Sequence, residues 1–294
     1  MSRRALLLVN RKGASSHANI DQGLKVLESA GIEVSAHFCR RPDRIPELIR
    51  SDHGRADMII IGGGDGTVSM CLGAVLESGL PLGVLPMGNA NDLARTLAIP
   101  TRVTDACSVI GAGRIQRIDV GEVNARPFVN VASIGLSVDI AQRLTRQQKR
   151  RWGVLAYIGN AWEALHTATS FAARIECEGA ELDIKSIQIA VGNGRFYGGG
   201  MTIADDATID DRRLDLYAIE SQRWWRLAAC LPALRWGKQK FVDGVHTLSG
   251  ERIRIETDKP MPINVDGEVV AETPAEFSVN PAALPVFVPA GAQS

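Results

Sequence analysis

Residues 57–67 constrain the fold more than any other stretch of the sequence. Four apolar residues, from Met58 to Ile61, stand in a row, which is typical of a strand buried on both faces of a parallel sheet. Three glycines follow and let the backbone turn sharply and approach a ligand closely, because they carry no Cβ atom. After Thr67 the apolar residues recur at spacings of three and four, so we expect a helix to begin there.

A strand, a glycine turn and a helix N-terminus together form a pocket for phosphate, since backbone N–H groups point outward and the helix dipole favours an anion. The alternative is a tight turn that binds no ligand. Asp65 lies within this turn, and a carboxylate among phosphate-binding amides requires that a cation or a proton transfer also takes part. The turn therefore favours phosphate chemistry.

Composition narrows the class of protein. Hydrophobic residues make up 45% and charged residues 22% of the 294 positions, as in an ordinary globular protein. Lysine plus arginine equals aspartate plus glutamate, 33 each, so the net charge indicates no nucleic-acid partner. The five cysteines are scattered without a Cys-x-x-Cys pair, which predicts reduced thiols and no zinc site. No stretch is long enough to span a membrane, so we expect a soluble, cytoplasmic protein.

Strands and helices alternate in the first part of the chain. We expect strands over residues 6–9, 32–39, 58–61 and 82–85, and helices over 20–30, 44–51 and 93–97. Asn91 and Asp92 should cap the last of these helices. The alternation predicts a doubly wound parallel sheet. Ligands bind at the carboxyl ends of the strands in such sheets, so loops 10–16, 62–67 and 86–92 should meet at one edge.

Near residue 115 the pattern changes to short segments that alternate polar and apolar residues, which predicts an antiparallel sheet or sandwich. We expect strands over 115–123, 127–134, 173–177, 182–191, 213–219, 252–257, 263–270 and 277–279, with helical insertions such as 138–168. The fold class is therefore α/β: a doubly wound parallel α/β domain over residues 1–120 and a β-rich, sandwich-like domain over 121–294. The last residues are free to return to the first domain.

Three motifs are weak when each is taken alone. Residues 86–95 read as a helix cap, and Asn193-Gly194-Arg195 with the glycines at 198–200 reads as a hairpin or bulge. Asp266-Gly267 is the pair typical of a two-residue hairpin turn. Glu268 follows this turn directly and would be held rigidly, which suits a general base.

Taken together, residues 63–67, 88–92 and 265–268 resemble the diacylglycerol kinase catalytic family, which includes sphingosine kinases and the bacterial YegS-like lipid kinases. The resemblance extends to residues 128–135 and 198–200, so it covers nearly the whole chain, and the YegS-like proteins are the most similar. It implies a nucleotide-binding α/β domain, a β-rich lipid-substrate domain and an active site in the cleft between them.

The resemblance also implies roles for individual residues. ATP would be bound by Cys39, Gly63, Gly64, Asp65, Gly66, Thr67, Val68, Ser69, Met70 and Asn89. Glu268 would accept the proton of the lipid hydroxyl, while Asp65 and Asp92 would orient phosphate, Mg²⁺ or substrate. A second magnesium site would use the carboxylate of Asp211 and the backbone carbonyls of Thr208 and Arg213.

Four positions depart from the family pattern. Cys39 and Asn89 stand where threonine is usual, and Arg212 stands where glycine is common. The first loop has Asn10-Arg11 in place of Asn-Pro. Because of these departures, an alternative interpretation stays open: the protein is a non-catalytic sensor that binds a nucleotide or a lipid. NAD kinase shares the glycine turn and is a second alternative, but it explains neither residues 91–92 nor residues 266–268.

Trp224, Trp225 and Trp236 are interleaved with basic residues, a combination that suits a membrane interface. The alternative is a helix that buries these tryptophans against the β-rich domain. We expect a lipid substrate at a membrane surface, peripheral contact with the inner face of the membrane and no nucleic acid, and the sequence leaves a homodimer open.

Overall fold

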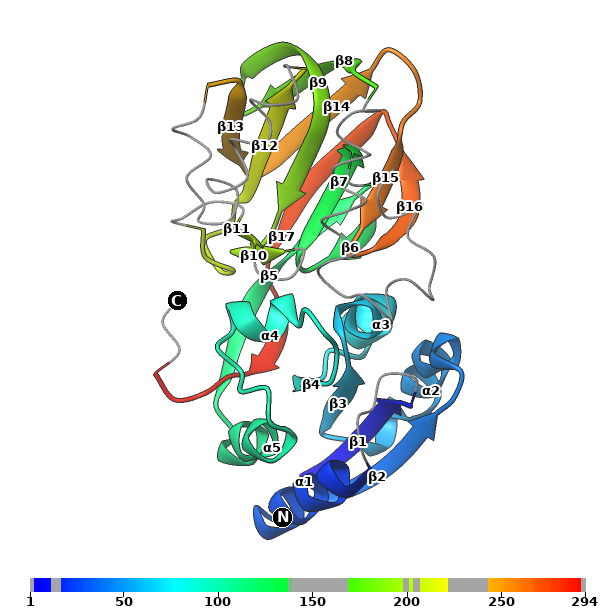
Figure 1. Cartoon of the computed structure of the whole chain (residues 1–294). Helices are drawn as coiled ribbons and strands as arrows, with labels where there is room; N and C mark the ends of the chain where they lie inside the picture. The colour runs from blue at the N-terminus through cyan, green and yellow to red at the C-terminus, as the bar shows by residue number, and fades with distance from the viewer. Residues whose placement is uncertain are drawn as a thin grey trace.

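Two groups of elements lie one above the other in the computed structural model (Figure 1). The lower group combines helices with a parallel sheet, and the upper group is built from antiparallel strands. The structure describes residues 3–11, 17–136, 138, 169–197, 201–202, 207–221 and 243–291. This arrangement confirms the predicted fold class.

The lower group is a parallel sheet with strand order β2-β1-β3-β4. Its strands are β1 (Arg3–Asn10), β2 (Ile32–Cys39), β3 (Met58–Gly63) and β4 (Leu82–Pro86). All of β3 and β4 is buried, as expected when helices cover both faces. One helix pair is α1 with α5, and the other is α2 with α3. The helices are α1 (His17–Ser29), α2 (Ile45–Asp52), α3 (Asp65–Ser78), α4 (Asp92–Thr96) and α5 (Val103–Ala112), with 3₁₀ turns at Pro42–Arg44 and His53–Arg55.

The upper group is antiparallel and has its own apolar core. Its strands are β6 (Arg126–Phe128), β7 (Val131–Gly135), β8 (Phe171–Cys177), β9 (Ala180–Gly192), β12 (Leu214–Glu220), β13 (Val245–Gly250), β14 (Arg252–Thr257), β15 (Pro262–Val265) and β16 (Glu268–Glu272). A short separate pair consists of β10 (Phe196–Tyr197) and β11 (Met201–Thr202).

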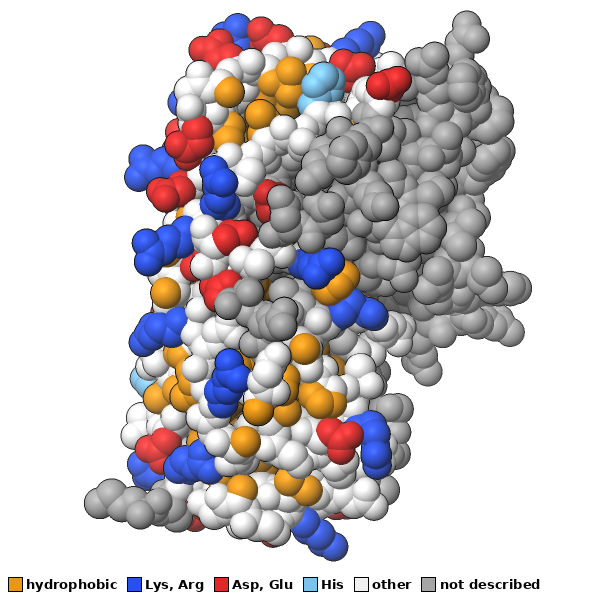
Figure 2. Space-filling view, turned by 90° about the vertical axis from the view of Figure 1, so that its left-hand side faces the viewer, with side chains coloured by type: hydrophobic (Ala, Val, Ile, Leu, Met, Phe, Trp, Pro, Cys, Tyr) orange, Lys and Arg blue, Asp and Glu red, His pale blue; other side chains and the backbone are white. Residues whose placement is uncertain are grey.

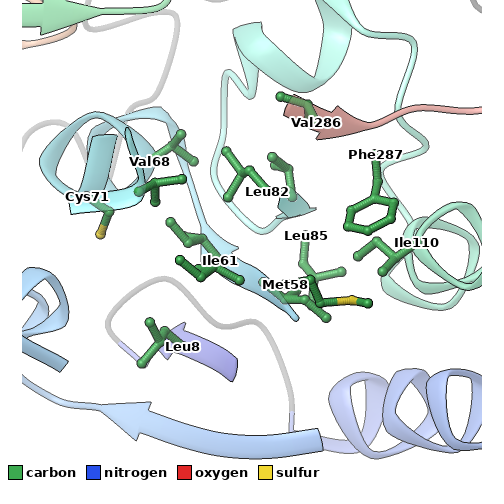
Figure 3. Close-up of a cluster of buried hydrophobic side chains, with 14 of the residues drawn as sticks. Leu8, Met58, Ile61, Val68, Cys71, Leu82, Leu85, Ile110, Val286 and Phe287 are labelled. Carbon is green, nitrogen blue, oxygen red and sulfur yellow. The ribbon is translucent and has the colours of Figure 1, made fainter. Parts of the chain in front are cut away.

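Two long strands join the groups. β5 (Ile115–Val123) and β17 (Ala275–Phe287) pair antiparallel along most of their length. The end of β17 also pairs with β4, where Val286 lies opposite Leu82. Val286 and Phe287 point into the lower core among Leu82, Leu85 and Ile110 (Figure 3). The last strand therefore contributes to both cores.

Several local predictions need correction. Helix α3 begins at Asp65 rather than after Thr67, because Gly64 is its N-cap. The expected strand 127–134 is divided between β6 and β7, and the segment 263–270 is a hairpin. Helix α5 and strand β13 were not predicted.

Other predictions fall on parts of the chain that are not described. The helical stretch 138–168, with the exception of residue 138, the glycines at 198–200 and the tryptophan segment lie outside the described residues. Within the described ranges, no helix has both the length and the apolar character needed to cross a membrane. On the face seen in Figure 2, acidic and basic side chains are interspersed, in keeping with the balanced composition.

Candidate active site

The glycine turn between β3 and α3 presents the start of a helix at the carboxyl edge of the parallel sheet. Gly64 has extended backbone, with φ −94° and ψ −177°, and its carbonyl accepts the N–H groups of Thr67 and Val68 at 2.9 and 3.2 Å. Helix geometry leaves the N–H groups of Asp65 and Gly66 without an intrahelical acceptor. Their dipoles favour an anion at this position. Thr67 and Val68 are buried, so Val68 could contact a phosphate only through its main chain.

The loop after β4 touches the glycine turn at a point where only glycine fits. A Cβ atom on Gly88 would lie 2.5 Å from the Cα of Gly64 and 2.9 Å from Oδ1 of Asn91. The N–H of Met87 also donates to the carbonyl of Gly63 at 2.9 Å. The two glycine-containing motifs predicted to meet at one sheet edge are thus in direct contact.

Asn91 occupies the N-cap position of α4, as predicted, but its side chain does not cap the helix. Its backbone is left-handed (φ 51°), and its side chain makes no cap hydrogen bond. Instead, Oδ1 accepts from the N–H of Gly88 and Nδ2 donates to its carbonyl, both at 2.9 Å. The N–H of Leu93, in the first turn of α4, donates at 3.3 Å to the carboxylate of Asp65. Asp65 therefore connects the starts of two helices, and Asp92 is buried beside this contact.

The first two strands bring further predicted residues to the same edge. Asn10 and Cys39 are partners at the ends of β1 and β2, and the N–H of Arg11 donates to the carbonyl of Cys39 at 3.0 Å. Nδ2 of Asn10 donates to Oγ1 of Thr67 at 2.9 Å. Burial raises the pKa of the half-buried Cys39 thiol, so this thiol is neutral near pH 7. Asn89 is exposed next to the half-buried Gly88.

The β15–β16 hairpin has the predicted two-residue turn. Asp266 and Gly267 both have positive φ, 48° and 102°, and Val265 lies opposite Glu268. Glu268 is exposed at the start of β16. Burial and, to a smaller extent, the charge of Asp65 raise the pKa of Asp266 to about 6, against the opposing effect of hydrogen bonds from residues 129–131. Helix α3, which begins in the glycine turn, packs against β6, and the residues that follow β6 hold Asp266 by hydrogen bonds. The hairpin turn and the first helix after the glycine turn therefore pack on the same short segment of the chain.

The loop that carries the predicted metal ligands is held together by hydrogen bonds to Asp211. The carboxylate of Asp211 accepts the N–H groups of Thr208 and Arg213 at 3.1 and 3.0 Å, which leaves further lone pairs on both oxygens. One carboxylate and main-chain carbonyls form an oxygen set that suits Mg²⁺, so these residues fit the ion. The described part of the chain holds no group of three or more His, Cys, Asp or Glu side chains placed to bind a metal. Arg212 has left-handed backbone (φ 62°), which explains why glycine suits this position.

Sequence reasoning missed Asp119, a carboxylate in the middle of β5 that is only 2% exposed. It accepts the N–H groups of Arg212 at 2.6 Å and Ala282 at 2.7 Å. Asn193, also missed in this role, donates from Nδ2 to the carbonyl of Asp119 at 2.8 Å. These bonds attach the metal loop to the two strands that join the halves. The only signal in the sequence is a charged residue inside an apolar strand pattern.

One cavity among the described residues does not coincide with this site. It has a volume of about 200 Å³ and lies between α1 and α5; its lining consists of Asn19, Gln22, Pro86, Met87, Thr101, Arg102, Val103 and Thr104. A much smaller hollow lies under the glycine turn, beside Gly64, Asp65 and Asn91. We place the candidate active site at this hollow, because its lining combines the predicted phosphate-binding glycines Gly63 and Gly64 with the carboxylate of Asp65.

These features, an anion-binding helix start and a carboxylate-bearing hairpin turn, are those expected of an enzyme that transfers a phosphoryl group. Residues 4–123 match the diacylglycerol kinase catalytic domain, and residues 130–288 match the YegS C-terminal NAD kinase beta sandwich-like domain. The chain therefore belongs to the diacylglycerol kinase catalytic family, as its motifs predict, and is a lipid kinase of the YegS-like type.

Individual relatives agree with this assignment. The chain is 29% identical to a diacylglycerol kinase of Staphylococcus saprophyticus over 90% of this chain and 87% of that protein. It is 28% identical to a diacylglycerol kinase of Staphylococcus aureus over 98% and 93% of the two chains. The chain is also 29% identical to an uncharacterized protein of Synechocystis, over 93% of this chain and 65% of that protein.

Solved structures share the fold. A diacylglycerol kinase structure from Bacillus anthracis superposes with a TM-score of 0.77 at 20% identity, over 99% of this chain and 98% of that one. A second structure from the same organism gives a TM-score of 0.86 at 23% identity, over 99% and 97% of the two chains. Each superposition includes both the parallel α/β half and the antiparallel half of the molecule.

Proposed function

We propose that this enzyme transfers the γ-phosphate of ATP to the hydroxyl of a lipid, with diacylglycerol or a related glycerolipid such as phosphatidylglycerol as the acceptor. The observation that carries the proposal is geometric: α3, which begins in the glycine turn, packs against β6, and the residues after β6 hold the Asp266–Glu268 turn. The relatives named diacylglycerol kinase support the choice of acceptor.

In this reaction the N–H groups at the start of α3 bind the phosphates of ATP, while Asp65 and Asp92 orient the reacting groups. Glu268 accepts the proton from the acceptor hydroxyl as its oxygen attacks the γ-phosphorus. A new O–P bond forms, the bond between the γ-phosphorus and the bridging oxygen breaks, and ADP leaves. The exposure of Glu268 suits a base whose partner is a lipid hydroxyl that arrives from outside.

Mg²⁺ is the cofactor we propose. When bound, it neutralises phosphate charge and stabilises the local loop conformation. Asp211 would hold it through its carboxylate, and Thr208 and Arg213 through their main-chain carbonyls. The hydrogen bond from the N–H of Arg212 to Asp119 fixes this loop against β5.

We propose that the enzyme reaches its substrate from the cytoplasmic side, as a peripheral protein on the inner face of the membrane. Trp224, Trp225 and Trp236 would enter the interface, and this role rests on sequence alone because these residues lie outside the described ranges. Replacing Trp224 and Trp236 with alanine should lower binding to anionic liposomes. Unchanged liposome binding and interfacial activity in this variant would contradict a membrane-docking role for the tryptophans. A homodimer is a separate prediction.

The test of the proposed function is a phosphotransfer assay with labelled ATP and a panel of acceptors: diacylglycerol, phosphatidylglycerol, a sphingoid base and NAD. We expect label in a glycerolipid product that depends on Mg²⁺. Label in NAD alone would contradict a lipid kinase and favour an NAD kinase. A chain that binds ATP but labels no acceptor would favour the sensor.

A further inference from the structure

Three consecutive main-chain N–H groups converge on the side chain of Asp266. Its Oδ1 accepts from Val131 at 3.0 Å and from Asn130 at 3.2 Å, and its Oδ2 accepts from Val129 at 3.3 Å. Such a row of N–H groups is an anion-binding nest. Here the occupant is a carboxylate of the chain itself, 135 to 137 residues away in the sequence.

Two of the three donors lie in the short gap between strands β6 and β7. Residues 129 and 130 separate β6 from β7, and their N–H groups face Asp266. The N–H of Asp266 returns a bond to the carbonyl of Val131 at 2.9 Å. The hairpin turn is thus fastened to the start of β7 by four hydrogen bonds.

The attachment fixes where the turn lies. Asp266 has left-handed backbone, with φ 48°, which aspartate tolerates in a two-residue hairpin turn, so the turn conformation alone does not set its position against the rest of the domain. Gly267 is held by one further bond, from its N–H to Oδ1 of Asn264 at 2.9 Å. Beyond the turn, β16 is the edge strand of the described sheet and pairs with β15 alone. The position of Glu268 therefore depends on how firmly the turn is held.

We propose that Asp266 is a positioning residue for phosphoryl transfer, which clamps the hairpin turn onto residues 129–131 and so aims Glu268 at the acceptor hydroxyl. This inference rests on the proposed function. It assigns Asp266 no contact with ATP or lipid, and so predicts that its loss slows turnover without weakening nucleotide binding.

The test compares Asp266→Asn, Asp266→Ala and a control, Glu272→Gln. The asparagine keeps one oxygen for Asn130 and Val131, but it directs an NH₂ group at the N–H of Val129, where two donors meet. Glu272 is an exposed carboxylate at the far end of the same hairpin, and its replacement makes the same change of charge. All three variants and the wild type are assayed as the full chain for kcat, KM for ATP and melting temperature.

Because charge-assisted hydrogen bonds are strong, we expect kcat to fall about tenfold in Asp266→Asn and about a hundredfold in Asp266→Ala. KM for ATP should stay within about twofold in both, and Glu272→Gln should match the wild type. If the alanine variant does not fold, Asp266→Asn carries the test, since it retains two of the three bonds.

Normal turnover in a folded Asp266→Asn variant would overturn the clamp. So would a parallel loss of turnover, ATP affinity and melting temperature, because that pattern marks general structural damage. If the wild-type chain transfers no phosphate to any acceptor, the proposed function itself is wrong. The wild-type assay therefore distinguishes failure of the proposed function from failure of the positioning role of Asp266.

Discussion

Replacement of Gly88 by alanine tests the contact between the two glycine motifs. A Cβ atom there would lie 2.5 Å from the Cα of Gly64, whereas carbon atoms in contact are about 3.5–4.0 Å apart. The loops must then separate by about 1 Å. Overpacking of this kind costs about 1–3 kcal/mol, and each kcal/mol lowers the melting temperature of a chain of this size by about 2–4 °C.

The same separation moves Gly64 and the start of α3, so ATP affinity should fall together with stability. Thermal unfolding followed by circular dichroism and a titration with a fluorescent ATP analogue measure the two effects. Gly73→Ala is the matched control. A Cβ atom on Gly73 meets nothing within 4 Å, and alanine in a helix interior is about 0.5–1 kcal/mol more favourable than glycine. A Gly88→Ala variant with wild-type melting temperature and ATP affinity would refute the close approach.

Two further predictions concern charge and backbone strain. The folded-state pKa of Asp266, about 6, lies above its ordinary value of 3.8, so its contribution to the free energy of unfolding is greatest below about pH 4 and is lost as the pH rises through about 6. The difference in urea stability between wild type and Asp266→Asn should vary over that pH range, and a constant difference would contradict the raised pKa. Arg212→Gly should raise the free energy of unfolding by up to about 1 kcal/mol, because Arg212 has left-handed backbone; a less stable variant in a urea titration would contradict this.

The sequence predicted the elements whose patterns are local. The apolar run at β3 and the alternation over residues 252–257 correspond directly to strands. Helix α5 also has the apolar spacing of an amphipathic helix, at Val103, Ala106, Cys107 and Ile110, so the sequence could have predicted it. The start of α3 was misplaced because glycine at the N-cap conceals where the helix begins.

The contacts that organise the site are long-range, and a sequence pattern does not contain them. The carboxylate of Asp65 binds the N–H of Leu93, 28 residues away. That bond replaces the cap expected from Asn91, whose left-handed backbone directs its side chain to Gly88. Asp266 looked like an ordinary turn residue, since its three donors lie on a distant segment.

The central claim is that the glycine turn of the first half and the hairpin of the second half act in one phosphoryl transfer. The most direct test is Glu268→Gln, which keeps the shape of the side chain and removes the proton acceptor. With ATP, Mg²⁺ and the preferred glycerolipid, we predict that kcat falls at least about a hundredfold while the Kd for ATP is unchanged. Normal turnover by this variant would contradict the account.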